Sequence, residues 1–503
     1  MHHVIIGNGI AGITTARHLR KLDSDCEITV ISAETDHFWS RTALMYIFMG
    51  HMKFEHTKPY EDWFWPKNRI KLLNKYVERG DPDTQTLYFS DGGELKYDKL
   101  LLATGSKPNK FGWPGQDLKG VQGMVSYQDL QSMEEQAPHI RRAIIVGGGL
   151  IGIEMAEMFH SRHIPVSFLV REKSFWKRVM PPQESAMINR EIDAAHGIDL
   201  RLGTELEEII GDERGWVKAI RTKDGEVIDC EFVGLTAGVH PNLSLADSLG
   251  VETNRGFLVD EYLETSVPNI YAAGDCCELR EAAPGRRGIE AIWYTGKLQG
   301  PVLAKTMTGN PTPYRQGLYF NSAKFLDIEW QTYGTVNAAP AEHEAQLYWE
   351  HADGRKGIRL IYHKDEGHII GFNLMGIRFR KDTCLAWIAE KAHVETVLAH
   401  LEEANFDPEF FLTYENELAL TYQRQTGKSV ALAPVKVGGL ARSIGLLVGV
   451  ALILILGSLA LPAGVLRGIM QGIGGLVFTI GLVKTIELLY RGSQKGFQRL
   501  RFS

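Results

Sequence analysis

Two glycine-rich loops and one long uncharged segment predict the fold class of this 503-residue chain. The loops span Gly7–Gly12 and Gly147–Gly152, and each lies between a short apolar run and a helix-like stretch. Strand–loop–helix units of this kind build parallel sheets with helices on both faces. The sequence therefore predicts an α/β protein with two Rossmann-like dinucleotide-binding domains, followed by a small α+β domain and a transmembrane helical hairpin.

The composition is that of a folded protein, with 44% apolar and 23% charged residues. The formal net charge of −6 supplies no overall positive field, so we expect no nucleic-acid partner. The five cysteines form no C-x-x-C motif and have no ligand-like spacing. Free thiols and no metal site are therefore expected.

The first loop begins the first predicted domain. An apolar strand, His3–Ile6, leads into Gly7, Gly9 and Gly12, and the helix-like "ITTARHLRKL" follows. In this spacing the first glycine makes a tight turn, the second lets a pyrophosphate approach, and the third allows close helix–strand packing. Glu34 closes the next strand, "EITVIS", where a carboxylate can accept hydrogen bonds from ribose hydroxyls.

The second loop repeats this pattern with Gly147, Gly149 and Gly152. After the next strand, "VSFLV", Arg171 comes first and Glu172 second. A guanidinium at this place can clamp the extra phosphate of NADPH, whereas a carboxylate prefers the free hydroxyl of NADH. If these charges only face solvent, the nicotinamide preference stays open. Two units in one chain predict two dinucleotides, FAD and NAD(P)H, with a hydride passing between their rings.

At this point the sequence resembles the FAD-dependent pyridine nucleotide reductases, which include ferredoxin reductases, nitrite reductase flavin domains, type II NADH dehydrogenases and disulfide reductases. The resemblance depends on four stretches in the right order: both glycine loops, "YDKLLLATGSKP" at 97–108, and "ETSVPNIYAAGDC" at 264–276. It covers residues 1 to about 310.

The resemblance implies roles in FAD binding. The three glycines of the first loop and Glu34 would hold the ADP half of FAD, and Arg41 would lie near its pyrophosphate. Thr104 and Gly105 would form the crossover where the chain leaves the FAD domain. Asp275 would bond the ribityl chain.

Further roles concern NAD(P)H. The three glycines of the second loop would cradle its phosphates, with Glu154 near the nicotinamide. Arg171 is the candidate phosphate clamp described above. Gly238, in "AGVHPN", would close this domain and return the chain to FAD.

Departures from the family narrow the chemistry. Between Arg41 and Gly80 there is no cysteine, which excludes a thiol relay and leaves the redox chemistry to FAD. Tyr46 follows the Arg41 motif where ferredoxin reductases often carry a lysine. The stretch "GIEAIWYTGKLQG" lacks the paired glutamines of type II NADH dehydrogenases, and its Trp293 and Tyr294 either stack near the flavin or belong to the core.

Beyond residue 310 the chain changes character. Residues 311–425 alternate like strands and then form an amphipathic pattern, "TCLAWIAEKAHVETVLAHL" at 383–401, which predicts one helix. A small α+β domain of this kind suits a homodimer contact.

The residues 443–466 carry no charge and would form about 36 Å of helix, enough to cross a bilayer. A second apolar run, 468–483, predicts a hairpin. Positive residues flank both ends, so we expect a multi-pass protein of the cell membrane with its flavin domains in the cytoplasm.

The complete expected division follows from these features. The ranges are 1–115 and 245–310 for the FAD-binding domain, 116–244 for the NAD(P)-binding domain, 311–425 for the α+β domain, 426–439 for a linker, 440–490 for the transmembrane hairpin, and 491–503 for a basic cytoplasmic tail.

The expected function is that of a membrane-anchored FAD-dependent NAD(P)H oxidoreductase. It would pass electrons to a quinone or to a membrane-bound redox protein, with the lipid bilayer as a further partner. The alternative is a flavoprotein subunit or redox-sensing scaffold of a larger membrane complex, with little turnover alone.

Overall fold

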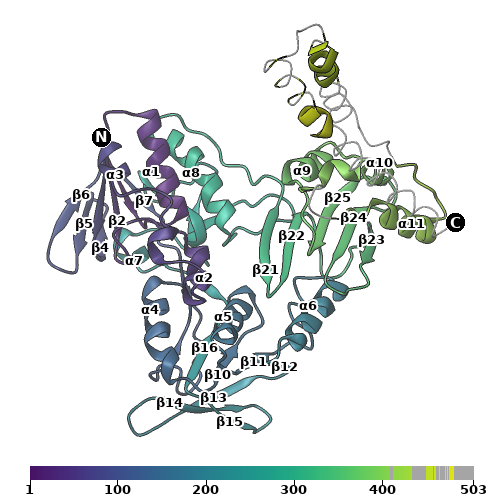
Figure 1. Cartoon of the computed structure of the whole chain (residues 1–503). Helices are drawn as coiled ribbons and strands as arrows, with labels where there is room; N and C mark the ends of the chain where they lie inside the picture. Colours follow the sequence, from purple (N-terminus) through teal and green to yellow (C-terminus); the bar gives the residue numbers. More distant parts are fainter. Residues whose placement is uncertain are drawn as a thin grey trace. The chain divides into compact units, whose positions relative to one another are not determined.

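The computed structural model of the chain divides into two compact units, Met1–Val430 and Ala431–Ser503. It describes the residues 1–407, 412–432, 449–456, 458, 459, 464, 469, 471, 473 and 475–480. Figure 1 shows the course of the chain from the first strand to the helices near residue 420.

A parallel sheet forms the first part of the large unit. Its order is β19-β7-β1-β2-β3, and every neighbouring pair runs parallel. The strands are β1 (His2–Ile6), β2 (Glu27–Ser32), β3 (Ile70–Asn74), β7 (Lys99–Leu102) and β19 (Ile270–Ala272). The last three residues of the central strand, Val4, Ile5 and Ile6, are apolar and buried, as expected for a strand covered on both faces.

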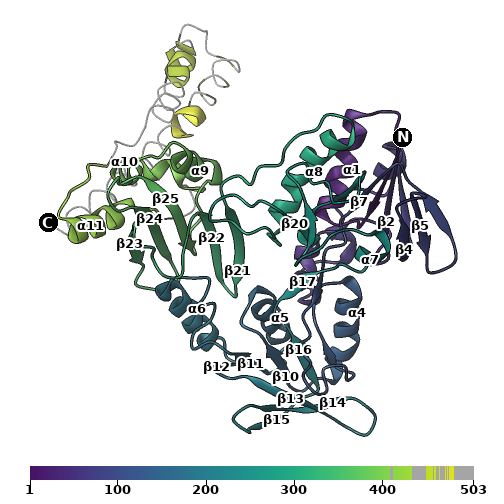
Figure 2. The same ribbon diagram turned by 180° about the vertical axis from the view of Figure 1, so that it is seen from behind.

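Two helices far apart in sequence cover this sheet together. Helix α1 (Ile10–Leu22) lies against α8 (Trp293–Met307), as Figures 1 and 2 show. A Cβ added at Gly300 would lie only 2.7 Å from the Thr14 side chain. The residues after 290 therefore complete the layer that the first helix begins.

A second parallel sheet repeats the first. Its order is β12-β11-β10-β16-β9. The strands are β9 (Val121–Gln122), β10 (Ala143–Val146), β11 (Val166–Val170), β12 (Ile198–Leu202) and β16 (Phe232–Leu235). Its principal helices are α4 (Tyr127–Gln136), α5 (Leu150–Ser161) and α6 (Pro182–Ala194).

Both sheets also carry the same insertion, which lies between β3 and β7 in the first sheet and between β12 and β16 in the second. In each case it is a three-stranded antiparallel sheet. The strands are β4 (Val77–Asp81), β5 (Thr86–Phe89) and β6 (Glu94–Lys96) in the first, and β13 (Leu206–Gly211), β14 (Val217–Thr222) and β15 (Val227–Asp229) in the second. The prediction of two Rossmann-type units in an α/β fold is confirmed.

The chain crosses between the two sheets through a short antiparallel ribbon. Strand β8 (Ser106–Pro108) leaves the first sheet and β17 (Val239–Pro241) returns from the second, with His240 opposite Lys107. The remaining short elements of this region are α2 (Leu44–Phe48), α3 (Phe64–Lys67), α7 (Ala246–Leu249), β18 (Phe257–Val259) and β20 (Cys277–Leu279).

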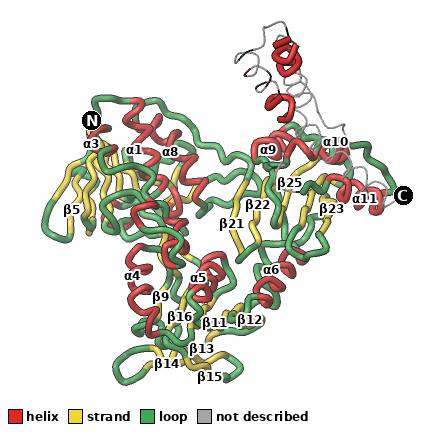
Figure 3. The backbone as a smooth tube through the Cα atoms, in the orientation of Figure 1, coloured by secondary structure: helices red, strands yellow, loops and turns green. Residues whose placement is uncertain are grey.

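A five-stranded antiparallel sheet follows, with the order β21-β22-β25-β24-β23. Figure 3 shows the helices that follow this sheet beside its strands. Ile358 and Leu360 belong to one core with these helices, whereas Arg359 between them contacts α6. The elements are β21 (Phe320–Phe325), β22 (Ile328–Gly334), β23 (Glu344–Glu350), β24 (Gly357–His363), β25 (Ile369–Met375), α9 (Lys381–Ala389), α10 (Val394–Ala399) and α11 (Glu415–Thr426).

The single helix expected at 383–401 is two helices, α9 and α10. Between them Lys391 has a positive φ of 52°, and the next residues extend. The Ala392 carbonyl accepts a hydrogen bond from the Ile369 N–H at 2.8 Å, and His393 pairs with His368. The helical pattern is interrupted because the chain adds briefly to the edge of the sheet.

The expected membrane localisation is wrong. Among the residues that the structure describes, no helix has the length and apolar character of a membrane span. Much of the range 440–490, the second half of the linker (433–439) and all of the tail 491–503 lie outside the described residues.

Candidate functional site

A cavity of about 650 Å³ lies at the carboxyl ends of the first sheet's strands. This is where open parallel sheets bind ligands. Of the residues predicted from the sequence, eight line it: Gly7, Gly9, Glu34, Arg41, Thr104, Gly105, Glu154 and Asp275. The other six do not line it: Gly12, Gly147, Gly149, Gly152, Arg171 and Gly238.

Two glycines of the first loop are required by the polypeptide itself. Gly7 has a φ of 116°, and a Cβ there would lie 2.0 Å from the Ala103 carbonyl oxygen. A Cβ at Gly12 would lie 2.1 Å from the Gly7 oxygen. These positions fix the turn and the close approach of α1 to the sheet.

Gly9 is different because nothing in the protein requires it to be glycine. Its φ of −72° suits any residue, and an added Cβ would meet no atom within 4 Å. It precedes α1, whose N-terminus has no side-chain cap and so presents free N–H groups. An open glycine at an uncapped helix N-terminus fits the close approach of a phosphate.

The second loop has the same construction. Gly147 has a φ of 122°, and a Cβ at Gly152 would lie 2.1 Å from the Gly147 oxygen. A Cβ at Gly149 would have its nearest neighbour, the Thr236 oxygen, at 4.0 Å. Helix α5 also starts without a side-chain cap, so this loop fits a second phosphate group.

Glu34 lies at the end of the first cavity and is held on two sides. The Arg41 guanidinium pairs with its carboxylate through both oxygens, and the Tyr127 backbone N–H donates to Oε1 at 2.8 Å. Arg41 also donates to the Val125 carbonyl. The structure thus pairs Glu34 with Arg41. The resemblance implied separate roles for them, with Glu34 at the ribose and Arg41 near the pyrophosphate.

Comparing the strand register of the two sheets identifies the counterpart of Glu34. Ile31 pairs with the residue before Gly7, and Leu169 pairs with the residue before Gly147. Glu34 and Glu172 each come three residues after these partners. Glu172 therefore has the same position relative to the second glycine loop as Glu34 has relative to the first.

Arg171 lies one position earlier in this register, with its side chain 58% exposed and 3.1 Å from Glu172. Arg178 approaches the same Glu172 oxygen at 3.6 Å. The sequence pattern drew attention to Arg171, whereas the strand register places Glu172 in the position that corresponds to Glu34.

The crossover residues bind one another across the cavity floor. Thr104 Oγ1 donates to the Asn242 carbonyl at 2.7 Å, and the Asn242 N–H donates to the Gly105 carbonyl at 2.8 Å. Asp275 accepts a hydrogen bond from Ser106 Oγ at 3.3 Å, and burial raises the pKa of its carboxyl. Gly238, with a φ of 87°, lies in the returning strand's turn outside the cavity.

A family model described as Pyridine nucleotide-disulphide oxidoreductase matches residues 1–300. The chain belongs to this family. FAD and NAD(P)H are the family's cofactors, and the predicted enzyme class, an FAD-dependent NAD(P)H oxidoreductase, is confirmed at the level of the family. The two open glycines at uncapped helices fit these two cofactors.

Relatives extend the match beyond residue 300. Nitrite reductase [NAD(P)H] of Bacillus subtilis (strain 168) is 31% identical over 395 residues, which are 78% of this chain and 47% of that protein. The 5,5'-dehydrodivanillate O-demethylase ferredoxin reductase subunit of Sphingobium sp. (strain NBRC 103272 / SYK-6) is 29% identical, over 74% of this chain and 89% of that protein.

The chain spans about half the length of the first of these relatives. Among solved structures, the ferredoxin reductase for the CYP199A2 system from Rhodopseudomonas palustris has a TM-score of 0.68 at 23% identity. The superposition covers 75% of this chain and 91% of the ferredoxin reductase, and this likeness supports the fold.

This family member has no cysteine at its cavity. All five cysteines are buried and unbridged, and the described residues that line the cavity include none of them. Trp293 does line the cavity, with the Lys297 ammonium 4.8 Å from its ring centre.

Several lining residues were missed by sequence reasoning, chiefly Val125, Ser126 and Gln128 at the start of α4. Gln128 donates to the Glu34 carbonyl at 2.7 Å. The capping box of Ser126 and Asp129 signals the helix start. The capping box does not indicate that the start of α4 lies against the loop that carries Glu34, which precedes Tyr127 by 93 residues.

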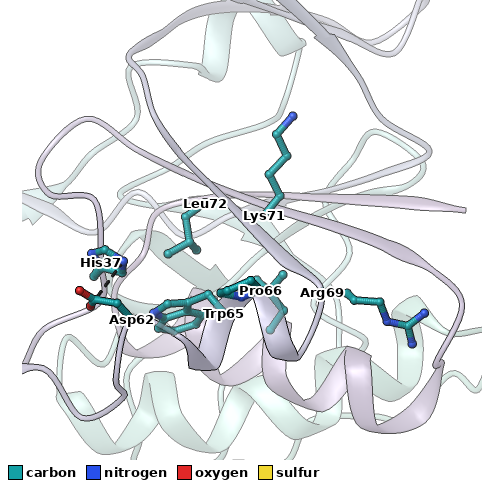
Figure 4. Close-up of a pocket in the computed structure, with 8 residues that line it drawn as sticks. His37, Asp62, Trp65, Pro66, Arg69, Lys71 and Leu72 are labelled. Carbon is teal, nitrogen blue, oxygen red and sulfur yellow. Dashed lines mark ion pairs between the residues drawn. The ribbon is translucent and has the colours of Figure 1, made fainter.

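A second hollow, of about 490 Å³, lies on the outside of the first sheet (Figure 4). His37, Asp62 and Trp65 line it, and His37 Nε2 lies 3.6 Å from Asp62 Oδ1. None of the predicted site residues lines this hollow.

Proposed function

We propose that this protein takes a hydride from NAD(P)H onto FAD and passes the electrons to a protein electron carrier. One observation supports this above all: a single cavity brings together the first phosphate loop and a residue of the helix that follows the second, Glu154. Two cofactors bound to the two loops would therefore meet at this cavity.

The first loop and its surroundings are proposed to hold FAD. Gly9 and the α1 N-terminus would take the pyrophosphate, and Glu34, fixed by Arg41, would accept the ribose hydroxyls. Asp275 and the Thr104 crossover would hold the ribityl side. When bound, FAD supplies the conversion of a two-electron donor into one-electron steps.

The second loop is proposed to hold NADH in preference to NADPH. Gly149 and the α5 N-terminus would take the pyrophosphate. Glu172, in the register of Glu34, would accept hydrogen bonds from the ribose and would repel a 2′-phosphate. Arg171 and Arg178 would hold this carboxylate in place.

A protein carrier is proposed as acceptor because a relative that the chain covers almost completely is named a ferredoxin reductase subunit. The cavity itself contains no thiol that could relay electrons. Quinone remains an outcome of the test below.

The predicted division of the large unit is part of this proposal. Residues 1–115 and 245–310 would form the FAD-binding domain, 116–244 the NAD(P)-binding domain, and 311–425 the α+β domain. The two repeated parallel sheets and the antiparallel sheet support it. A homodimer contact through the α+β domain stays a prediction, which sedimentation of the purified chain would measure.

The test is anaerobic reduction of the full-length yellow protein by NADH and NADPH in turn. We expect rapid bleaching of the flavin, faster with NADH, followed by fast reoxidation by a [2Fe–2S] ferredoxin. A colourless protein, or a flavin that neither nicotinamide bleaches, would overturn the proposal. Reoxidation by a soluble quinone alone would replace the protein carrier by quinone, and slow reoxidation by every acceptor would favour a subunit role.

A further inference from the structure

Glu154 is the charged side chain that the second parallel-sheet domain contributes to the cavity of about 650 Å³. Ile151 and Glu154 are one turn apart on α5 and both line the cavity. Within the described part of the chain, no hydrogen bond or ion pair holds the Glu154 carboxylate, and its electrostatic neighbour is another carboxylate, Glu157.

Glu157, one turn further along α5, takes the nearby cation. Lys324 reaches from β21 of the antiparallel sheet and places its Nζ 2.9 Å from Glu157 Oε1. Glu157 is 7% exposed, so this pair is largely shielded from water. The helix thus carries two carboxylates, of which the inner one is neutralised and the cavity-facing one is not.

Other titratable groups act on this pair or line the cavity. They are Tyr46 and His51 from α2 and the turn after it, Asp327 from the turn after β21, and Glu34, Arg41, Lys75 and Asp275 on the cavity wall. Of these, His51 and Asp327 act on Glu157, and Tyr46 acts on Lys324. None supplies Glu154 with a cation in contact.

This arrangement places the protonation of Glu154 in the neutral range. Burial, and then the charge of Glu157, raise the pKa of the Glu154 carboxyl to about 7. The carboxyl is neutral below that pH and negative above it.

We propose that Glu154 distinguishes oxidised from reduced nicotinamide by charge, and that Lys324 adjusts this discrimination by holding Glu157. The proposal rests on the proposed function, because it needs a nicotinamide ring at this cavity. The ring of NAD⁺ is a cation and the ring of NADH is neutral. A carboxylate with no counter-ion in a half-buried place attracts the first and has no net Coulomb interaction with the second.

Linkage gives the direction of the pH dependence. A bound cation stabilises the charged carboxylate and lowers its pKa, so NAD⁺ affinity must rise as the pH rises through the raised pKa. If bound NAD⁺ lowers the pKa by about one unit, its affinity rises about fivefold between about pH 6 and pH 8, and about tenfold over the whole titration. Affinity for a neutral ring should stay constant within about twofold over this range.

The experiment uses the full-length FAD-containing protein in its oxidised form. Dissociation constants are measured from the perturbation of the flavin absorption by NAD⁺ and by 1,4,5,6-tetrahydro-NAD, whose neutral ring cannot donate a hydride. Both series run across the neutral pH range, so no turnover enters the measurement.

Three variants and one control variant sharpen the test. Glu154→Gln should abolish the pH dependence and hold NAD⁺ affinity at the weak, low-pH value. Lys324→Gln leaves Glu157 uncompensated, so the rise should move to higher pH. Glu157→Gln leaves Lys324 uncompensated, so the rise should move to lower pH. Lys223→Gln breaks an exposed lysine–glutamate pair elsewhere in the same domain and should match the wild type.

The decisive result is that Lys324→Gln and Glu157→Gln move the pH at which NAD⁺ affinity rises in opposite directions. A merely structural role would instead disturb the binding of NAD⁺ and of 1,4,5,6-tetrahydro-NAD in the same direction. They also keep the test decisive if Glu154→Gln fails to retain FAD. NAD⁺ binding that does not change with pH, or equal changes for both ligands, would overturn the inference. A protein that binds neither nicotinamide would instead overturn the proposed function.

Discussion

The two glycine loops have the same backbone but different surroundings. In both, the first and third glycines are required by contacts of about 2–3 Å with the protein, and the middle glycine meets nothing. The carboxylate after the first loop, Glu34, is tied to the start of α4 from the other unit. Its counterpart Glu172 is tied to two arginines on the protein surface. The glycine pattern thus defines the turn before each helix, whereas remote contacts determine how each loop is enclosed.

The largest expected effect distinguishes glycines that the protein needs from those that it leaves open. Gly12→Ala and Gly152→Ala each place a Cβ 2.1 Å from a carbonyl oxygen. We expect each to lower the free energy of unfolding by about 3 kcal/mol, measured by urea denaturation. Gly149→Ala, with an open Cβ position in the same loop, is the control and should lose less than about 1 kcal/mol. Equal stability of all three variants would break the comparison.

The middle glycines should separate the two cofactors. Gly9→Ala should weaken FAD binding by about 2 kcal/mol, roughly thirtyfold, while the apoprotein keeps its melting temperature. Gly149→Ala should keep its FAD and raise the KM for the nicotinamide by a similar factor of roughly thirty. FAD content after dialysis and steady-state kinetics measure the two effects. If Gly149→Ala lost FAD and Gly9→Ala did not, the assignment of the loops would be reversed.

The ribose-binding carboxylate of the second unit is tested next. Glu172→Gln removes the charge that would repel a 2′-phosphate. We expect the ratio of kcat/KM for NADH over NADPH to fall about tenfold, equivalent to about 1.4 kcal/mol. Arg171→Gln serves as the matched variant one position earlier, and a larger loss there for NADPH than for NADH would favour the phosphate clamp instead.

The smallest effect compares the ion pairs of the two carboxylates. Arg41→Met should lower the free energy of unfolding by about 0.5–1 kcal/mol, because Glu34 is only 17% exposed and keeps its Tyr127 N–H bond. Arg178→Met should change it by less than about 0.3 kcal/mol, because that side chain is 76% exposed. Equal losses in thermal or urea unfolding would show that the two carboxylates are held alike.

Much of the site could be predicted because its signals are local. The spacing of Gly7, Gly9 and Gly12 and the apolar strand before them were sufficient to place the first strand–turn–helix unit, and the second unit repeats this pattern. The helix expected at 383–401 was wrong because pairing of His393 with His368 on the sheet overrides helical periodicity. The membrane hairpin rested on the length of two apolar runs and on the positive residues that flank them, and the described residues contain no helix that spans a bilayer.

By itself the sequence determined the two nucleotide-binding units, their order and their glycines, because a tight turn and a helix start depend on neighbouring residues. Only the tertiary structure decided which charges meet. Arg41 and Tyr127 converge on Glu34, and Lys324 selects Glu157 and leaves Glu154 without a cation. These contacts join residues up to 167 positions apart. Because an electrostatic interaction depends on distance in space and on burial, such pairings follow from the packing of whole domains.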